Sequence, residues 1–117
     1  MLGENQGCPG WCVLIVKEHV EHLAEWPAAR QARLFEDVAR VASAVRAEFG
    51  GGGTPPRINY ECLGNVVAHV HWHVIPRHAG DPTPRQPVWG LAPEQLRGAM
   101  TEDERSALAA RLRGRLD

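Results

Sequence analysis

Apolar and polar residues alternate in one short stretch of the chain, residues 69–75. This alternation, in a run rich in β-branched and aromatic residues, predicts a half-buried β-strand. Successive side chains of a strand project to opposite faces. We therefore expect Val70, Trp72 and Val74 to pack into a core, while the polar residues between them project together from the other face.

Residues 12–16 form a further apolar run with the length of a strand, and the mixed stretch of residues 57–63 also predicts a strand. The second is followed by Gly64-Asn65, a pair typical of turns. We expect it to form a hairpin with the strand of residues 69–75, which Pro76 should end.

The remaining patterns predict two helices and an irregular segment. Apolar residues recur at intervals of three and four across residues 28–49, as in an amphipathic helix. Thr101 and Glu104 have the spacing of a capping box, which predicts a terminal helix. Residues 76–93 are rich in proline and are expected to wrap over the surface, with Trp89 as an anchor.

The length of 117 residues indicates one domain, residues 1–117, with a substantial core. Residues 1–10 form a short or incomplete N-terminal segment, and residues 76–117 form the proline-rich tail and the terminal helix. The net charge of −1 gives no sign of a partner that is a nucleic acid polymer. There is no long apolar run and no signal-peptide pattern, so we expect a cytoplasmic protein without a membrane partner.

The three cysteines form no paired framework. We expect buried or free thiols in a reducing compartment, with Cys62 as a small packed residue. A zinc half-site formed by Cys8 and Cys12 is the alternative interpretation.

His69, His71 and His73 account for half of the chain's six histidines. On one strand face their side chains are roughly 7 Å apart. A row of imidazoles contributes little to packing, because each buried ring nitrogen needs a polar partner. Three interpretations follow: a metal site, nucleophilic catalysis, or a structural or binding role without turnover.

The spacing of the histidines argues against one shared metal ion, and chemistry gives nucleophilic catalysis a rationale. The outer two histidines are roughly 13 Å apart along a strand, too far for one zinc ion with bonds of about 2 Å. A neutral imidazole is a good nucleophile toward phosphorus, and charge on one ring disfavours charge on the next. The backbone N–H groups of Gly64 and Asn65, just before the strand, could meet phosphate oxygens.

The run His69-Val70-His71-Trp72-His73-Val74-Ile75 resembles the signature of the histidine triad (HIT) family, in which three histidines alternate with apolar residues. The flanking segments look like the bacterial branch described as diadenosine tetraphosphate hydrolase-like: Ile58-Asn59-Tyr60-Glu61, Leu63-Gly64-Asn65-Val66, Ile75-Pro76-Arg77, Asp81-Pro82 and Pro87-Val88-Trp89. The resemblance implies a small α+β domain with an antiparallel sheet, one long helix and a C-terminal helix.

The resemblance also implies a function: a homodimeric nucleotide hydrolase or transferase that cleaves a phosphoanhydride or related bond. His71 would attack the α-phosphate and form a nucleotidyl-histidine intermediate, which water then hydrolyses. His69 would orient His71 through its backbone carbonyl, and His73 would contact the bridging or phosphate oxygen. Asn65 stands where relatives use an amide near the phosphates, beside Gly64. The substrate would be a nucleotide or dinucleoside polyphosphate, and no metal or other cofactor is required.

Two departures from the family pattern matter. Trp11 stands where the family has the histidine of its Pro-Gly-His segment, and Val66 replaces a serine or threonine that some branches use beside the leaving group. Only eight residues precede Pro9, where relatives have a further strand or hairpin. The alternative is therefore a nucleotide-binding protein with little or no turnover, and a histidine-ligated metal enzyme is the third interpretation.

Overall fold

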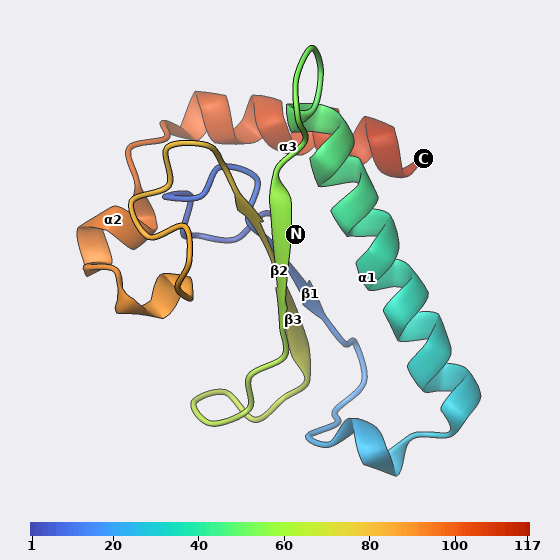
Figure 1. Ribbon diagram of the computed structural model, residues 1–117. Coiled ribbons are helices and arrows are strands. Elements are labelled where there is room, and N and C mark those ends of the chain that lie inside the picture. Colours follow the sequence, from blue (N-terminus) through green and yellow to red (C-terminus); the bar gives the residue numbers. More distant parts are fainter.

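The computed structural model describes all 117 residues, which form three strands and three α-helices with two short 3-10 turns (Figure 1). In chain order the elements are β1 (Cys12–Ile15), η1 (Leu23–Glu25), α1 (Ala28–Phe49), β2 (Arg57–Glu61), β3 (His71–Arg77), η2 (Val88–Gly90), α2 (Pro93–Arg97) and α3 (Glu102–Leu116). The α+β class, the antiparallel sheet, the long helix and the C-terminal helix are confirmed.

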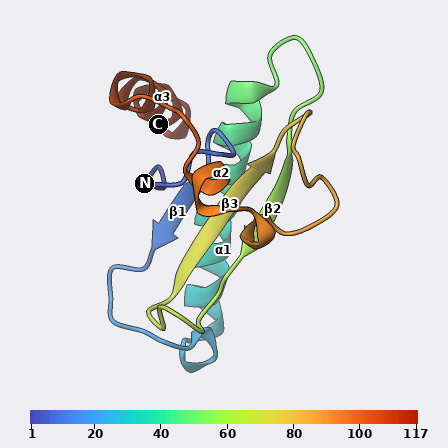
Figure 2. The same cartoon turned by 90° about the vertical axis from the view of Figure 1, so that its left-hand side faces the viewer.

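The strand β3 lies in the middle of the sheet and pairs antiparallel with β1 on one side and β2 on the other. Figure 2 shows α1 along one face of this sheet and the segment around α2 on the other. His73 is opposite Val13 of β1 and opposite Glu61 of β2. Neighbours on both sides fix which residues of β3 project to which face.

The face of the sheet that carries Trp72 and Val74 packs against the helices. One core cluster joins buried residues of the sheet, α1 and α3: Cys12, Val38, Ala42, Val45, Val74, Leu108 and Leu112. Trp72 packs against this cluster, and its ring also meets Phe35 of α1. The expected apolar face is therefore confirmed. None of the helices has the length and apolar character that a membrane-spanning segment needs.

The opposite face of the sheet is covered only in part. A second core cluster, formed by Cys8, Trp11, Ile75 and Val88, lies there, and Leu91 and Leu96 pack against it. These residues place the segment that holds η2 and α2 over the end of β3 that lies beyond His73. Nearer the start of β3 on this face, His71 and His73 are only partly buried.

The strand β3 begins and ends two residues later than the sequence predicts. His69 lies in the loop before it, because pairing with β1 begins at His71, opposite Ile15. Pro76 was expected to end the strand but lies inside it, opposite Ile58 of β2. Pairing with β1 stops at Val74, so the missing N–H of proline removes no hydrogen bond to that strand.

One prediction about a single residue is wrong. Cys62 is exposed rather than packed, because β2 ends at Glu61 and Cys62 begins the loop to β3. Trp89 contacts the buried Trp11 and so helps to anchor the proline-rich tail, although it is 42% exposed, and its neighbour Val88 is fully buried. Cys8 and Cys12 are buried free thiols, as expected.

Arg77, the last residue of β3, holds the proline-rich tail together. Its guanidinium donates from Nε to Asp81 Oδ2 at 2.5 Å, from Nη1 to the Gln86 carbonyl at 2.7 Å and from Nη2 to the Thr83 carbonyl at 2.6 Å. The hydrogen bond and charge of Arg77 lower the pKa of Asp81. All three guanidinium nitrogens are thus occupied within the fold, and Arg77 is not free to bind a ligand.

We predict that Arg77→Ala lowers the free energy of unfolding by about 3 kcal/mol, because it leaves the buried Asp81 carboxylate unpaired. Urea unfolding measures this change. Arg57→Ala is the matched control, since Arg57 pairs opposite Arg77 in the sheet but is exposed. Equal effects of the two substitutions would contradict the role given to Arg77.

Candidate active site

His71 and His73 project from the same face of β3, and their ring centroids are 5.1 Å apart with the rings almost perpendicular. Both side chains are partly exposed, although the Trp89 ring of η2 packs against the ring of His73. His69 precedes the strand, but its backbone and side chain contact the site as described below. The structure therefore brings the three histidines together around the open part of the sheet.

The backbone carbonyl of His69 fixes the ring of His71. The distance from His71 Nδ1 to the His69 oxygen is 2.8 Å. A carbonyl only accepts hydrogen bonds, so Nδ1 must carry the proton. In the neutral ring the lone pair is then on Nε2, the nitrogen that does not face the carbonyl. This is the form of imidazole that can attack an electrophile.

The side chain of His69 is held in turn by the end of β1. Its Nε2 donates to the Val16 carbonyl at 2.6 Å, and its ring lies 5.8 Å from that of His19. The backbone ladder continues past the strand, since the Val16 N–H bonds to the Val70 carbonyl. These contacts hold the carbonyl that orients His71.

His73 has a different partner. The indole N–H of Trp11 donates to His73 Nδ1 at 3.1 Å, so the proton of the neutral ring is on Nε2. Burial lowers the pKa of His73 from its ordinary value of 6.5, the charge of His71 lowers it further, and Glu61 raises it. His71 and His73 are thus held in opposite tautomers by two different neighbours.

Sequence reasoning missed two residues that shape this site. The Trp89 ring meets the His73 ring at 5.3 Å and the Trp11 ring at 5.4 Å, edge to face in both cases. Its indole N–H donates to Glu61 Oε2 at 2.5 Å. Glu61 is opposite His73 because the loop of residues 62–70 is longer than the expected Gly64-Asn65 turn, so the sequence does not reveal this pairing. Trp89 was expected only as an anchor of the tail.

Gly64 and Asn65 lie in the loop of residues 62–70 that joins β2 to β3. Both are exposed, and neither makes a hydrogen bond to a histidine of the triad. The loop leads directly into His69, so it borders the site. Their proposed contact with phosphate stays a prediction.

No group of three or more His, Cys, Asp or Glu side chains is arranged to hold a metal ion. The metal interpretation of the histidine row therefore lacks a ligand set. Cys8 and Cys12 also gain no third ligand, so the alternative of a zinc half-site has no support in the geometry.

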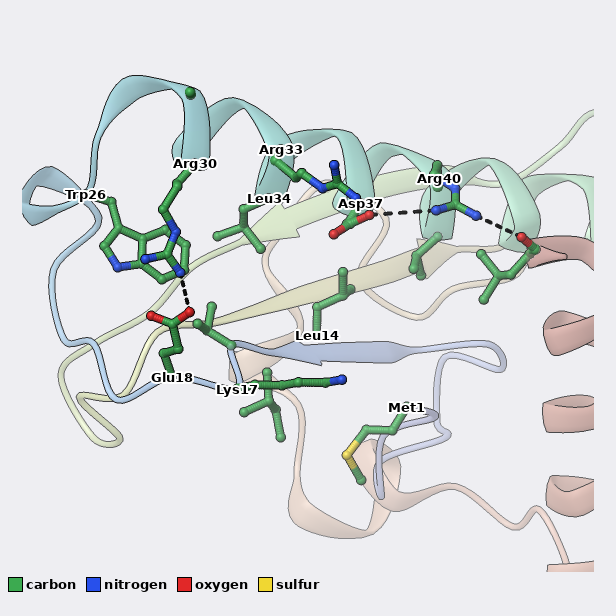
Figure 3. A pocket seen from close by; sticks show the side chains of 15 residues that line it. Met1, Leu14, Lys17, Glu18, Trp26, Arg30, Arg33, Leu34, Asp37 and Arg40 are labelled. Carbon is green, nitrogen blue, oxygen red and sulfur yellow. Dashed lines mark hydrogen bonds and ion pairs between the residues drawn. The ribbon is translucent and has the colours of Figure 1, made fainter.

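A cavity of about 830 Å³ lies away from the histidines, between β1 and α1 (Figure 3). Leu14 lines it from the sheet, and Arg30 and Arg40 line it from the helix. The arginines are engaged: Arg30 pairs with Glu18 at 2.6 Å, and Arg40 bonds to the carbonyl of Leu116. No histidine of the triad lines this cavity.

A family model described as the HIT domain matches residues 2–80, more than half of the chain. The chain belongs to the HIT-domain family. The histidine signature read from the sequence is therefore confirmed at the level of the family, whereas the hydrolase-like branch still rests on flanking motifs alone. HIT-family proteins bind nucleotides.

Individual HIT proteins are similar over most of the chain. The protein hit of Bacillus subtilis (strain 168) is 29% identical over 109 residues, which cover 92% of this chain and 74% of that protein. A HIT protein from Sinorhizobium meliloti 1021, known from its crystal structure, has 30% sequence identity to this chain. The two structures match with a TM-score of 0.82 over 97% of this chain and 79% of that one. A histidine triad protein from Marinobacter aquaeolei VT8 is also 30% identical, with a TM-score of 0.78 over 98% and 79%.

We predict that the folded protein loses stability in acid because of His73. The pKa of His73 is lower in the folded chain, so the unfolded chain takes up this proton first and the free energy of unfolding falls below pH 6.5. His73→Gln cannot take up a proton and should lose less stability. Urea unfolding about one unit above and about one unit below pH 6.5 tests this; equal losses in both proteins would contradict it.

Proposed function

We propose that the protein is a nucleotide hydrolase or transferase that cleaves a phosphoanhydride or related bond, with His71 as its nucleophile. The observation that carries the proposal is the hydrogen bond from His71 Nδ1 to the His69 carbonyl, which leaves the Nε2 lone pair free. A nucleotide or dinucleoside polyphosphate is the substrate, in line with the resemblance to the diadenosine tetraphosphate hydrolase-like branch. A location in the cytoplasm stays a prediction.

In the first step, the lone pair of His71 Nε2 attacks the α-phosphorus and a nitrogen–phosphorus bond forms. The bond from phosphorus to the bridging oxygen breaks, and the leaving phosphate departs with the electron pair. His71 becomes positively charged and keeps its Nδ1 proton, so the hydrogen bond to the His69 carbonyl becomes charge-assisted and stronger.

In the second step, water attacks the same phosphorus and loses a proton to solvent. The nitrogen–phosphorus bond breaks, and the electron pair returns to Nε2 of His71.

His73 donates from Nε2 to the bridging or phosphate oxygen in the first step, since Trp11 occupies its Nδ1. The exposed backbone of Gly64 and Asn65 would supply further donors to the phosphates.

Intact-mass analysis after brief incubation with a dinucleoside polyphosphate tests this mechanism. We expect a nucleotidyl adduct on the wild-type protein and none on His71→Ala. We also expect His71→Ala to lower kcat by about three orders of magnitude or more, with nucleotide binding largely retained.

His22→Ala is the matched control, because His22 is exposed and lies outside the triad. It should form the adduct like the wild type. Equal turnover by His71→Ala and wild type would contradict the mechanism. Nucleotide binding with neither adduct nor turnover in the wild type would instead favour the alternative, a binding protein.

A homodimer is the second part of the proposal. The strand β2 is an outer edge of the sheet, where a second copy can pair. Exposed apolar side chains lie on this strand and the loop after it: Tyr60 is 50% exposed, Val67 56% and Val66 90%. Grouped apolar exposure of this kind is typical of an interface.

Size-exclusion chromatography with light scattering tests the dimer. We expect twice the chain mass for the wild type and the mass of one chain for Tyr60→Glu, which places a charge at the proposed interface. Ile15→Glu is the control, since Ile15 is 55% exposed on β1, at the other side of the sheet, and should leave the dimer intact. A monomeric wild type would contradict this part of the proposal.

A further inference from the structure

The indole of Trp11 is aimed at the triad from beneath the surface. Trp11 is 1% exposed and packs with Ile75 and Val88 in the second core cluster. Its Nε1 lies 3.1 Å from His73 Nδ1, and the two rings meet edge to face with centroids 5.6 Å apart. A residue near the start of the chain thus supplies a buried hydrogen-bond donor to a histidine 62 positions later.

The backbone around Trp11 leaves the indole little freedom. The Trp11 carbonyl accepts from the Gly3 N–H at 2.8 Å and from Gln6 Nε2 at 3.0 Å, while its N–H bonds to the Cys8 carbonyl. The indole ring is also packed edge to face against Trp89. Because the indole is fixed, its N–H determines which nitrogen of His73 carries the proton, and the indole does not reorient to suit the other form.

An indole N–H can only donate a hydrogen bond. His73 must therefore offer a lone pair at Nδ1, which puts the proton of the neutral ring on Nε2. Protonation of Nδ1 would set two N–H groups against each other and abolish the bond, so the contact also opposes the charged ring.

The other groups that face His73 do not supply this selection. On β3, His71 disfavours a second charge but makes no hydrogen bond to the His73 ring. On β2, Glu61 favours the charged ring, yet its Oε2 accepts from the Trp89 indole. The neighbour on β1 is the apolar Val13. Trp11 is the group in direct contact with Nδ1.

We propose that Trp11 is a positioning residue, which holds His73 in the neutral tautomer with its proton on Nε2 and so keeps a hydrogen-bond donor directed at the phosphate. The use of this donor rests on the proposed function, whereas the tautomer can be measured without turnover. Trp11, which stands where the family has a histidine, thus supports the triad through His73.

A neutral His73 also suits the chemistry proposed for its neighbour. His71 gains a positive charge when it attacks phosphorus, and a second positive ring with its centroid 5.1 Å away would oppose that charge. By disfavouring protonation of His73, Trp11 would favour the intermediate formed on His71.

Long-range 1H–15N NMR spectra of the ¹⁵N-labelled protein test the proposal, since they report the tautomer and the pKa of each histidine. In the wild type we expect His73 to carry its proton on Nε2. In Trp11→Phe, which keeps an aromatic ring but lacks the N–H, we expect a mixture of tautomers and a His73 pKa higher by about half to one unit.

Trp89→Phe is the matched control. Trp89 meets His73 at a similar distance and in a similar orientation, but its N–H bonds to Glu61. We expect this variant to keep the Nε2 tautomer of His73. If the aromatic ring alone were responsible, both variants would keep the Nε2 tautomer of His73, and the proposal would be overturned.

The wild-type spectrum decides the matter even if Trp11→Phe fails to fold, because a proton on Nδ1 of His73 would overturn the proposal directly. Where the protein turns over substrate, the acid limb of kcat/KM should move upward by the same half to one unit in Trp11→Phe. The proposed function is tested separately, by the adduct on His71.

Discussion

Antiparallel pairing of β3 with strands on both sides is the constraint on which the site depends. It holds Trp72 and Val74 in the core beneath α1 and thereby commits His71 and His73 to the opposite face. A shift of register by one residue would bury the histidines and expose the tryptophan, at a large cost in apolar burial. The same packing that stabilises the sheet therefore positions the imidazoles.

On that framework, two neutral neighbours give the histidines opposite chemical roles. A carbonyl that only accepts leaves His71 with a lone pair on Nε2, and an indole that only donates leaves His73 with a proton on Nε2. Neither role needs a charged partner in direct contact. In the proposed mechanism, the site thus obtains a nucleophile and a hydrogen-bond donor from the same residue type through local hydrogen-bond geometry.

Much of the fold could be predicted from the sequence, because periodicity reports directly on burial. The alternation around Trp72 predicted which face of β3 packs inward, and the spacing of apolar residues predicted the span of α1. The exact start of β3 could not be predicted, since it depends on where β1 ends its pairing. Pro76 can lie inside the strand for a related reason, because the pairing of β3 with β1 ends at Val74.

Local sequence patterns could not predict the contacts that complete the site. Trp11 and His73 are 62 residues apart, and only the packed fold brings the indole to the ring. Trp89 was expected only as an anchor of the tail, whereas its indole also contacts Glu61 and His73, and its neighbour Val88 lies in the core. Arg77 likewise serves the fold because three groups of the tail converge on its guanidinium.

The central claim is that the free lone pair of His71 attacks phosphorus and is later displaced by water. The stereochemical course of hydrolysis at a chiral, isotopically labelled α-phosphorus tests this most directly. Two successive in-line displacements each invert the phosphorus, so the account predicts overall retention of configuration. Overall inversion would show a single attack by water and would contradict it.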